Sequence, residues 1–317
     1  MNRKVAYIFP AFGMEYRSLA RNCLPGYQDE LSRLLTRARK VVPIDLRKFA
    51  APSELTLDDV FQENLQNHYI CYVDSCVVGS LLRHKIDCQY VAGYSMGLFA
   101  ALCHASAVTF EDGLRLMHYT CTLAHEAAQE GDYGMGAVVG LSVDEIRALI
   151  ARNTVEVEIA TICSPRVTVV SGKRCDVERL LEASEALGSL RTSLLPVRVP
   201  FHSPHLRPVE GRIAEVLEQI EIRPPTCGIV SCGSHKVLSS QADIREEAIA
   251  NVSHPIDWFQ TMKRLLGLGV DLFVECGLSD RLCHLARNIE GDYRIYHPLK
   301  FQQLFAALES AETALPS

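Results

Sequence analysis

The sequence contains no long apolar run. A membrane-spanning helix needs roughly 18 or more consecutive apolar residues, and no segment of the 317 residues approaches this length. Near the N-terminus the run from Val5 to Phe9 ends at Pro10, which makes it too short for the apolar region of a signal peptide. We therefore expect a cytoplasmic protein that does not associate with membranes.

An excess of positive charge is also absent. The formal net charge is −6, whereas a nucleic-acid-binding domain usually carries a basic face or stripe. The composition therefore argues against nucleic acid as a partner, and an acidic protein partner would need a local basic patch.

The sequence lacks a recognisable disulfide or metal pattern, although it has 12 cysteines. They are scattered through apolar segments of a long chain, which favours free, buried thiols in a reducing compartment. The nearest approach to a metal motif is Cys227, Cys232 and His235. Because no second CxxC pair accompanies these residues, we predict no metal site.

Short apolar runs alternate with segments of helical periodicity along most of the chain. The run VAYIF (5–9) predicts a buried strand, and CQYVAGYS (88–95) predicts a second strand followed by a helix. Residues 134–198 instead read as β-α-β-β-α-β, which is the ferredoxin-like order. The α/β alternation resumes after Pro200.

These patterns predict an α/β fold with one inserted unit. We expect a large α/β-hydrolase-like domain with a parallel sheet, formed by residues 1–130 and 200–310. A ferredoxin-like small subdomain is expected at 131–199 and a flexible tail at 311–317. A chain of this length can bury a core large enough for this arrangement.

One short stretch carries a candidate nucleophile. Ser95 lies between two glycines in Gly93-Tyr94-Ser95-Met96-Gly97. The motif G-x-S-x-G is weak alone, since a serine beside glycines is most often a turn residue. A strand before it and a helix after it are the context that a nucleophile elbow requires. Such a helix would also place backbone N–H groups beside the serine oxygen.

A serine nucleophile needs a base, and histidine is the usual one. His202 lies in VPFHSP (199–204), where two prolines restrict the backbone at the end of the inserted unit. A residue at such a junction can face a cleft. An ordinary α/β-hydrolase esterase would instead use a late aspartate and His297.

Several segments together resemble the malonyl-CoA:acyl carrier protein transacylase family, which includes polyketide acyltransferases, over about residues 3–310. They are IFPAFG (8–13), GYSMG (93–97), YGMGAVVGL (133–141), VPFHS (199–203), HPIDW (254–258) and FVECG (273–277). The resemblance implies transfer of an acyl group from a thioester, with Ser95 as nucleophile and His202 as base. It further implies an oxyanion held by the backbone N–H groups of Phe12 and Met96, and a histidine oriented by a backbone carbonyl near HPIDW.

The chain departs from this family at the substrate pocket. Family members that load malonyl groups have an arginine on the helix after the elbow, and Thr120 occupies that position here. A buried carboxylate without this partner is costly, so we predict a non-carboxylated acyl group, with a charge supplied by His118 as the alternative. The expected pocket walls, besides Met96, are Tyr94, Met117, Thr120, Met135 and Phe201.

Further departures bear on the reaction. Phe12, Leu98 and Cys163 stand where glutamine, glutamate and asparagine are frequent in the family. The chain looks similar to a free-standing branch that removes stalled acyl groups from carrier proteins of polyketide assembly lines. We therefore predict an editing acyl hydrolase, with a trans-acting acyltransferase as the first alternative. An unrelated esterase and a docking subunit without chemistry are further alternatives.

The expected partner is an acyl carrier protein. No cofactor is expected to be bound, because the substrate itself carries the phosphopantetheine thioester. Carrier proteins are acidic, so docking would need local positive charge, for which the candidates are Arg166, Arg198, Arg207 and Arg281.

Overall fold

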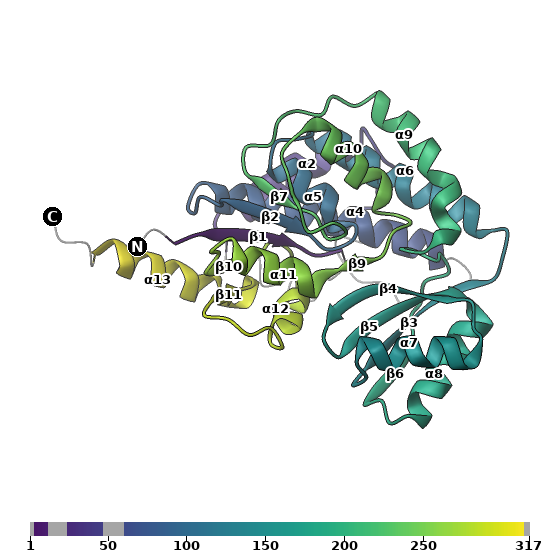
Figure 1. Cartoon of the computed structure of the whole chain (residues 1–317). Helices are drawn as coiled ribbons and strands as arrows, with labels where there is room; N and C mark the ends of the chain where they lie inside the picture. Colours follow the sequence, from purple (N-terminus) through teal and green to yellow (C-terminus); the bar gives the residue numbers. More distant parts are fainter. Residues whose placement is uncertain (1–2, 12–23, 47–59, 314–317) are drawn as a thin grey trace.

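A six-stranded sheet lies at the centre of the larger part of the molecule (Figure 1). The computed structural model describes residues 3–11, 24–46 and 60–313. The strand order is β11-β10-β1-β2-β7-β8, and neighbours are parallel from β11 to β7, whereas β7 and β8 are antiparallel. The strands are β1 (Val5–Phe9), β2 (Tyr90–Gly93), β7 (Gly228–Val230), β8 (Val237–Leu238), β10 (Leu272–Glu275) and β11 (Arg294–Tyr296).

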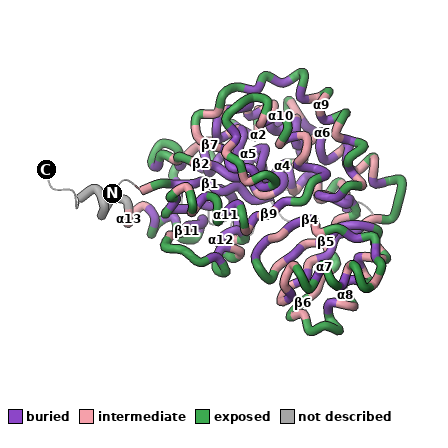
Figure 2. The backbone as a smooth tube through the Cα atoms, in the orientation of Figure 1, coloured by how far each residue is buried: buried purple, intermediate pink, exposed green. Residues whose placement is uncertain are grey.

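Both faces of this sheet are covered, which explains the continuous apolar runs of its central strands. On β1, Tyr7 and Phe9 belong to the larger of two buried clusters, and Ala6 and Ile8 belong to the other. The central strands are accordingly buried in Figure 2. The first face is covered by α2 (Tyr27–Ala38), α4 (Val60–Arg83), α5 (Gly97–His104), α6 (Phe110–Ala128), α9 (Glu210–Glu218) and α10 (Gln241–Ala250), and the second by α11 (Trp258–Gly267) and α12 (Arg281–Ala286).

A second, five-stranded sheet forms a smaller unit beside the first (Figure 1). Its order is β6-β3-β5-β4-β9. Five of its elements follow one another between residues 133 and 186, and β6 completes the run. They are β3 (Tyr133–Val139), α7 (Val143–Asn153), β4 (Val157–Ser164), β5 (Val167–Lys173), α8 (Arg174–Ala186) and β6 (Arg191–Leu194).

The two helices of the small unit cover one face of its sheet. Val138 and Val170 pack with Ile146 of α7 and Leu180 of α8 in a cluster of their own. The start of α7 is fixed by a capping box, in which Ser142 accepts from the backbone N–H of Glu145 and the Glu145 side chain accepts from that of Ser142. The opposite face of the sheet faces the larger part of the molecule.

The mixed α/β class predicted from the sequence is confirmed, with three differences in detail. The last strand of the β-α-β-β-α-β run expected over 134–198 ends at Leu194, since Pro196 lacks the N–H that a ladder needs. Residues 311–313 of the expected tail instead belong to α13 (Phe301–Thr313), and 314–317 lie outside the described residues. The sequence also did not predict β9 (Ile256–Asp257), which pairs with β4.

The remaining elements are two short 3-10 helices, η2 (Pro204–Val209) and η3 (Pro298–Lys300). Among the described residues, no helix has both the length and the apolar character needed to span a membrane.

Candidate active site

Ser95 lies on a sharp turn between β2 and α5. Its φ angle is +52°, a left-handed conformation that is unusual for a residue other than glycine. The turn is fixed by hydrogen bonds from Tyr94 N to Phe9 O (2.9 Å) and from Gly97 N to Tyr94 O (2.9 Å). This geometry presents a largely buried side chain, 9% exposed, as expected for the strand, turn and helix of a nucleophile elbow.

The glycines on either side of Ser95 are required by close backbone packing. A Cβ atom on Gly93 would lie 2.2 Å from Leu98 N, and one on Gly97 would lie 2.1 Å from Phe9 O. Because both neighbours are backbone atoms, no side-chain movement could relieve the overlap. The two glycines of the G-x-S-x-G motif are therefore needed because the turn packs tightly against β1 and α5.

His202 lies within hydrogen-bonding distance of Ser95. Its Nε2 is 2.7 Å from Ser95 Oγ, and its Nδ1 is 3.2 Å from the carbonyl oxygen of His254. A carbonyl can only accept, so Nδ1 carries the proton and Nε2 presents a lone pair to the serine. The backbone of His202, at φ +58°, is held by a bond from its N–H to Val252 O (2.8 Å).

Burial determines the charge of this histidine. The side chain is 2% exposed, and loss of solvation lowers the pKa of His202 to about 4. Hydrogen bonds to backbone carbonyls raise the pKa but only partly offset the effect. The imidazole is consequently neutral at physiological pH and able to accept a proton.

The backbone N–H of Met96 is available for an oxyanion. It donates no hydrogen bond within the described part of the chain, and it lies at the N-terminal end of α5, where the helix dipole favours negative charge. Asn251 Nδ2 donates to the backbone oxygen of Ser95 at 3.4 Å and so helps to hold the turn. The second predicted donor, Phe12, lies outside the described residues.

Ser95 and His202 open into a cavity of about 430 Å³ between the two sheets. From the small sheet, the register places Ala137, Val169 and Thr161 side by side on three neighbouring strands. The other walls come from the residues after β1, from the segment before His202 and from α12. The remaining lining residues are Pro10, Ala11, Tyr94, Met135, Leu195, Val197, Phe201, Arg281, Leu282, His284 and Leu285.

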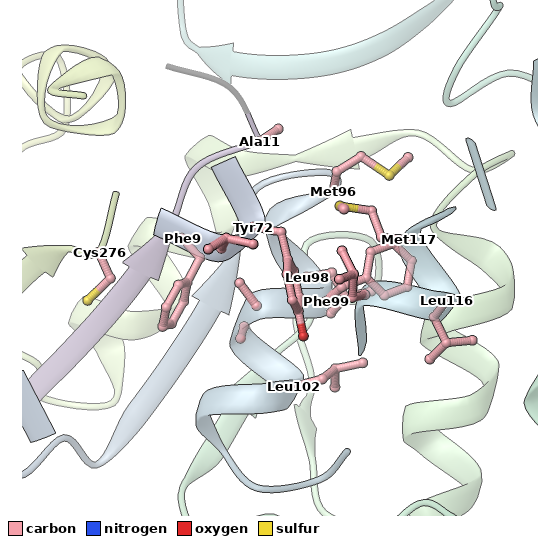
Figure 3. Close-up of a cluster of buried hydrophobic side chains, with 14 of the residues drawn as sticks. Phe9, Ala11, Tyr72, Met96, Leu98, Phe99, Leu102, Leu116, Met117 and Cys276 are labelled. Carbon is pink, nitrogen blue, oxygen red and sulfur yellow. The ribbon is translucent and has the colours of Figure 1, made fainter. Parts of the chain in front are cut away.

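Three of the six predicted pocket residues lie in this lining, whereas Met96, Met117 and Thr120 do not. Tyr94, Met135 and Phe201 line the cavity. Met117 and Thr120 are 1% and 0% exposed and lie outside it, so their placement as pocket walls was wrong. Figure 3 shows Met117 beside Met96 in the buried cluster of α5 and α6, because α6 turns this face toward the core.

Most of the cavity wall was not predicted from the sequence. Alternation along β3 marks Met135 and Ala137 as sharing a face, but nothing local shows that this face meets Ser95. Leu282 and Leu285 of α12 follow the quoted FVECG segment by several residues. Only the packing of the whole chain brings them to the nucleophile.

Other candidates from the sequence do not converge here. His297 is buried near the end of β11, at the far edge of the large sheet from β7 and β8, and Ser95 is bonded to His202 instead. Cys232 donates to Gly93 O at 3.1 Å, and His235 Nε2 lies 3.2 Å from Asp257 O. No group of three or more metal-ligating side chains occurs among the described residues.

The four arginines proposed for docking occupy different places. Arg281 lines the Ser95 cavity, and Arg198 lines a neighbouring cavity that shares Val197 and Phe201 with it. Arg166 donates to Gly140 O at 2.7 Å on the small unit, and Arg207 is exposed on η2. Their action as one surface stays a prediction.

Comparison with known proteins identifies the family. The family model described as "Acyl transferase domain" matches residues 86–278, which is more than half of the chain. The chain belongs to this acyl transferase family. The matched region contains both Ser95 and His202, together with the whole small unit.

Curated relatives and solved structures agree over nearly the full length. The chain is 26% identical over 292 residues to the malonyl CoA-acyl carrier protein transacylase of Bacillus subtilis, covering 90% of each chain. It is 27% identical over 296 residues to that of Staphylococcus aureus strain MW2, covering 92% of this chain and 94% of the relative. A structure of a type II PKS acyl carrier protein with its malonyl-transacylase matches with a TM-score of 0.84 and 24% identity, covering 97% of this chain and 99% of that one.

Proposed function

We propose that this acyl transferase moves an acyl group from a thioester onto Ser95 and then to the phosphopantetheine thiol of an acyl carrier protein. The observation that carries this proposal is the 2.7 Å contact between Ser95 Oγ and His202 Nε2 at the wall of a cavity. The carrier protein as partner is supported by the names of the relatives, which are carrier-protein transacylases.

The two residues would act in two half-reactions. His202 Nε2 takes the proton of Ser95 Oγ as the oxygen attacks the thioester carbon, and the tetrahedral oxyanion forms beside Met96 N. The C–S bond then breaks, and the imidazolium returns its proton to the departing thiolate. In the second half-reaction the acceptor thiol gives its proton to His202 and attacks the serine ester, which restores Ser95.

Transfer, rather than hydrolysis, is the reaction that the relatives support. The reported relatives are named transacylases, which favours the sequence analysis's acyltransferase alternative over its editing hydrolase. The same Ser95 and His202 would release a free acid if water replaced the acceptor thiol, so water access to the cavity decides between the reactions. We retain hydrolysis as the competing outcome of the experiment.

The cavity favours an uncharged acyl group. Its walls are mostly apolar, and Arg281 is the only lysine or arginine among the described residues that line it. Arg281 is exposed, which suits contact with the phosphate of the phosphopantetheine arm better than with a buried malonyl carboxylate. Thr120, at the family's arginine position, is fully buried outside the cavity.

We also propose the finer description of the fold. The β-α-β-β-α-β order and antiparallel pairing of β6, β3, β5 and β4 support a ferredoxin-like subdomain at 131–199. The parallel sheet with a serine elbow after β2 supports an α/β-hydrolase-like large domain formed by 1–130 and 200–310.

Intact-mass spectrometry of enzyme and carrier protein tests the function. The wild-type enzyme is incubated with acetyl-, hexanoyl- or malonyl-carrier, first alone and then with a second, free-thiol carrier. We expect an acetyl or hexanoyl adduct on the enzyme that passes to the second carrier, and little malonyl adduct. Clearance of the first carrier without an acceptor would instead establish hydrolysis.

Two variants complete the experiment. Ser95→Ala should form no adduct, whereas Ser106→Ala should behave as wild type. Ser106 is a matched control because it too has a positive φ, +58°, but lies at the other end of α5. An adduct that survives in Ser95→Ala would overturn the proposal.

A further inference from the structure

A fully buried carboxylate lies beneath the cavity wall formed by α12. Glu275 is the last residue of β10 and is 0% exposed. Its Oε1 accepts from Ser279 Oγ at 2.7 Å and from Leu282 N at 3.4 Å, and its Oε2 accepts from Cys283 N at 3.0 Å. The side chain thus joins the end of a central strand to the first turn of α12.

No cation in the described part of the chain offsets the charge of Glu275. Among the described residues it forms no ion pair, and all its described hydrogen bonds come from neutral groups. Burial raises the pKa of Glu275 to about 7, although the hydrogen bonds from Ser279, Cys283 and Leu282 favour the ionised form. Both protonation states are therefore populated near neutral pH.

The helix held by Glu275 contributes a wall of the candidate active site. Leu282, whose N–H bonds to the carboxylate, lines the cavity with Ser95, and so do Arg281 and Leu285 of the same helix. An ionised carboxylate can accept from all three donors, whereas a protonated one carries a hydrogen on one oxygen and loses acceptor capacity. The hydrogen bonds that fix α12 are therefore stronger when Glu275 is ionised than when it is protonated.

We propose that Glu275 is a positioning residue that sets the place of the α12 wall and thereby the preference for acyl chain length. The inference rests on the proposed function, because it assigns the cavity to the acyl group. When Glu275 is ionised, two hydrogen bonds from α12 and one from Ser279, just before it, fix the helix against the cavity. When it is protonated the wall loosens, and longer acyl chains gain relative to acetyl.

Other titratable groups lie close to Glu275, on the strand end that carries it and on α12. Cys276 follows it on the chain and Cys283 lies on α12, and burial raises the pKa of both thiols, so they stay neutral. Asp280 precedes α12 and pairs with His284 at 3.1 Å. Because His284 also lines the cavity, its contribution has to be separated from that of Glu275.

The test measures acyl selectivity as a function of pH. The ratio of kcat/KM for hexanoyl- and acetyl-carrier is recorded between about pH 5.5 and 8.5, a range centred near the pKa of Glu275. For the wild type we expect the ratio to rise about fivefold as pH falls, the effect of one hydrogen bond, with its midpoint near 7. Because both substrates use the same base, His202, any effect of pH on that base cancels in the ratio.

Three variants identify the group responsible. Glu275→Gln should give a ratio that does not change with pH. Ser279→Ala removes a donor that favours the ionised form, so the midpoint should move to higher pH; this variant carries the test if Glu275→Gln fails to fold. His284→Gln should keep the wild-type midpoint.

Glu247→Gln is the matched control for removing a buried carboxylate. Burial also raises the pKa of Glu247, and its Oε2 accepts from Ser231 Oγ at 2.6 Å, but it lines a different cavity. Its midpoint should stay near that of the wild type.

A flat wild-type ratio, or an unchanged profile in Glu275→Gln, would overturn the inference. Absence of any Ser95 adduct would instead overturn the proposed function.

Discussion

The carbonyl oxygen of His254 lies 3.2 Å from Nδ1 of His202, in the place where many serine enzymes have a carboxylate. A carbonyl fixes the tautomer and the ring orientation as an aspartate would. It brings no full negative charge, so its hydrogen bond only partly offsets the burial that lowers the pKa of His202 to about 4. The pair of Ser95 and His202 should therefore work without an acidic third member.

The first prediction concerns the pH dependence of Ser95 acylation. Neutral His202 is the active form, so the rate falls only when pH drops through its pKa of about 4. We expect the acid limb of kcat/KM well below the ordinary histidine value of about 6.5, measured by stopped-flow acylation. His68→Gln should leave this limb unchanged, since His68 lines a neighbouring cavity. An acid limb at or above pH 6.5 would contradict the burial argument.

The second prediction concerns the glycines of the elbow. Gly97→Ala places a Cβ 2.1 Å from Phe9 O, so we expect a loss of at least about 2 kcal/mol of stability and no acyl-enzyme. Gly211→Ala is the control: it lies in α9 with nothing within 4 Å and should stabilise by about 0.5–1 kcal/mol. Chemical denaturation and intact mass measure the two effects. Equal behaviour of the variants would refute the packing explanation.

The third prediction enlarges a small residue of the cavity. Ala137 faces the cavity beside Val169, so Ala137→Leu should shorten the acyl pocket. We expect kcat/KM for hexanoyl-carrier to fall by about tenfold or more, with acetyl changed far less, as for steric exclusion in an apolar pocket. Acetyl-carrier serves as the internal control. A uniform loss for both substrates would show that the change disturbs Ser95 rather than the acyl pocket.

The fourth prediction concerns Arg281 at the cavity. Replacing this exposed residue by alanine should raise KM for the carrier several-fold and weaken the salt dependence of the reaction, because a charged contact with the phosphopantetheine arm is lost. Arg152→Ala, at the end of α7, is the control. If Arg281→Ala instead changes only the use of malonyl-carrier, the arginine recognises the acyl carboxylate.

The sequence was most informative where function depends on local geometry. The order of strand, turn and helix around Ser95 could be predicted because G-x-S-x-G forces a tight turn, and the structure shows that turn. Ser142 with Glu145 three residues later has the spacing of a capping box, and the structure shows one. His202 was singled out by its position between two prolines and by the family resemblance, and the structure places it against Ser95.

The pocket could not be predicted in the same way. The family resemblance put Thr120 at the arginine position of a helix, but the direction of its side chain depends on how α6 packs against α4, α5 and α9. Arg281, Leu282 and Leu285 reach Ser95 only because β10 pairs with β1, which in turn pairs with β2. Such long-range pairings leave no local pattern in the sequence.

The strand β9 has a mechanical consequence. It begins at Ile256, two residues after His254, yet it is hydrogen-bonded into the sheet of the small unit through β4. The small unit cannot hinge away from the larger part without pulling on the segment whose carbonyl orients His202. Any movement of the small unit relative to the larger part would therefore also displace the carbonyl that orients the imidazole beside Ser95.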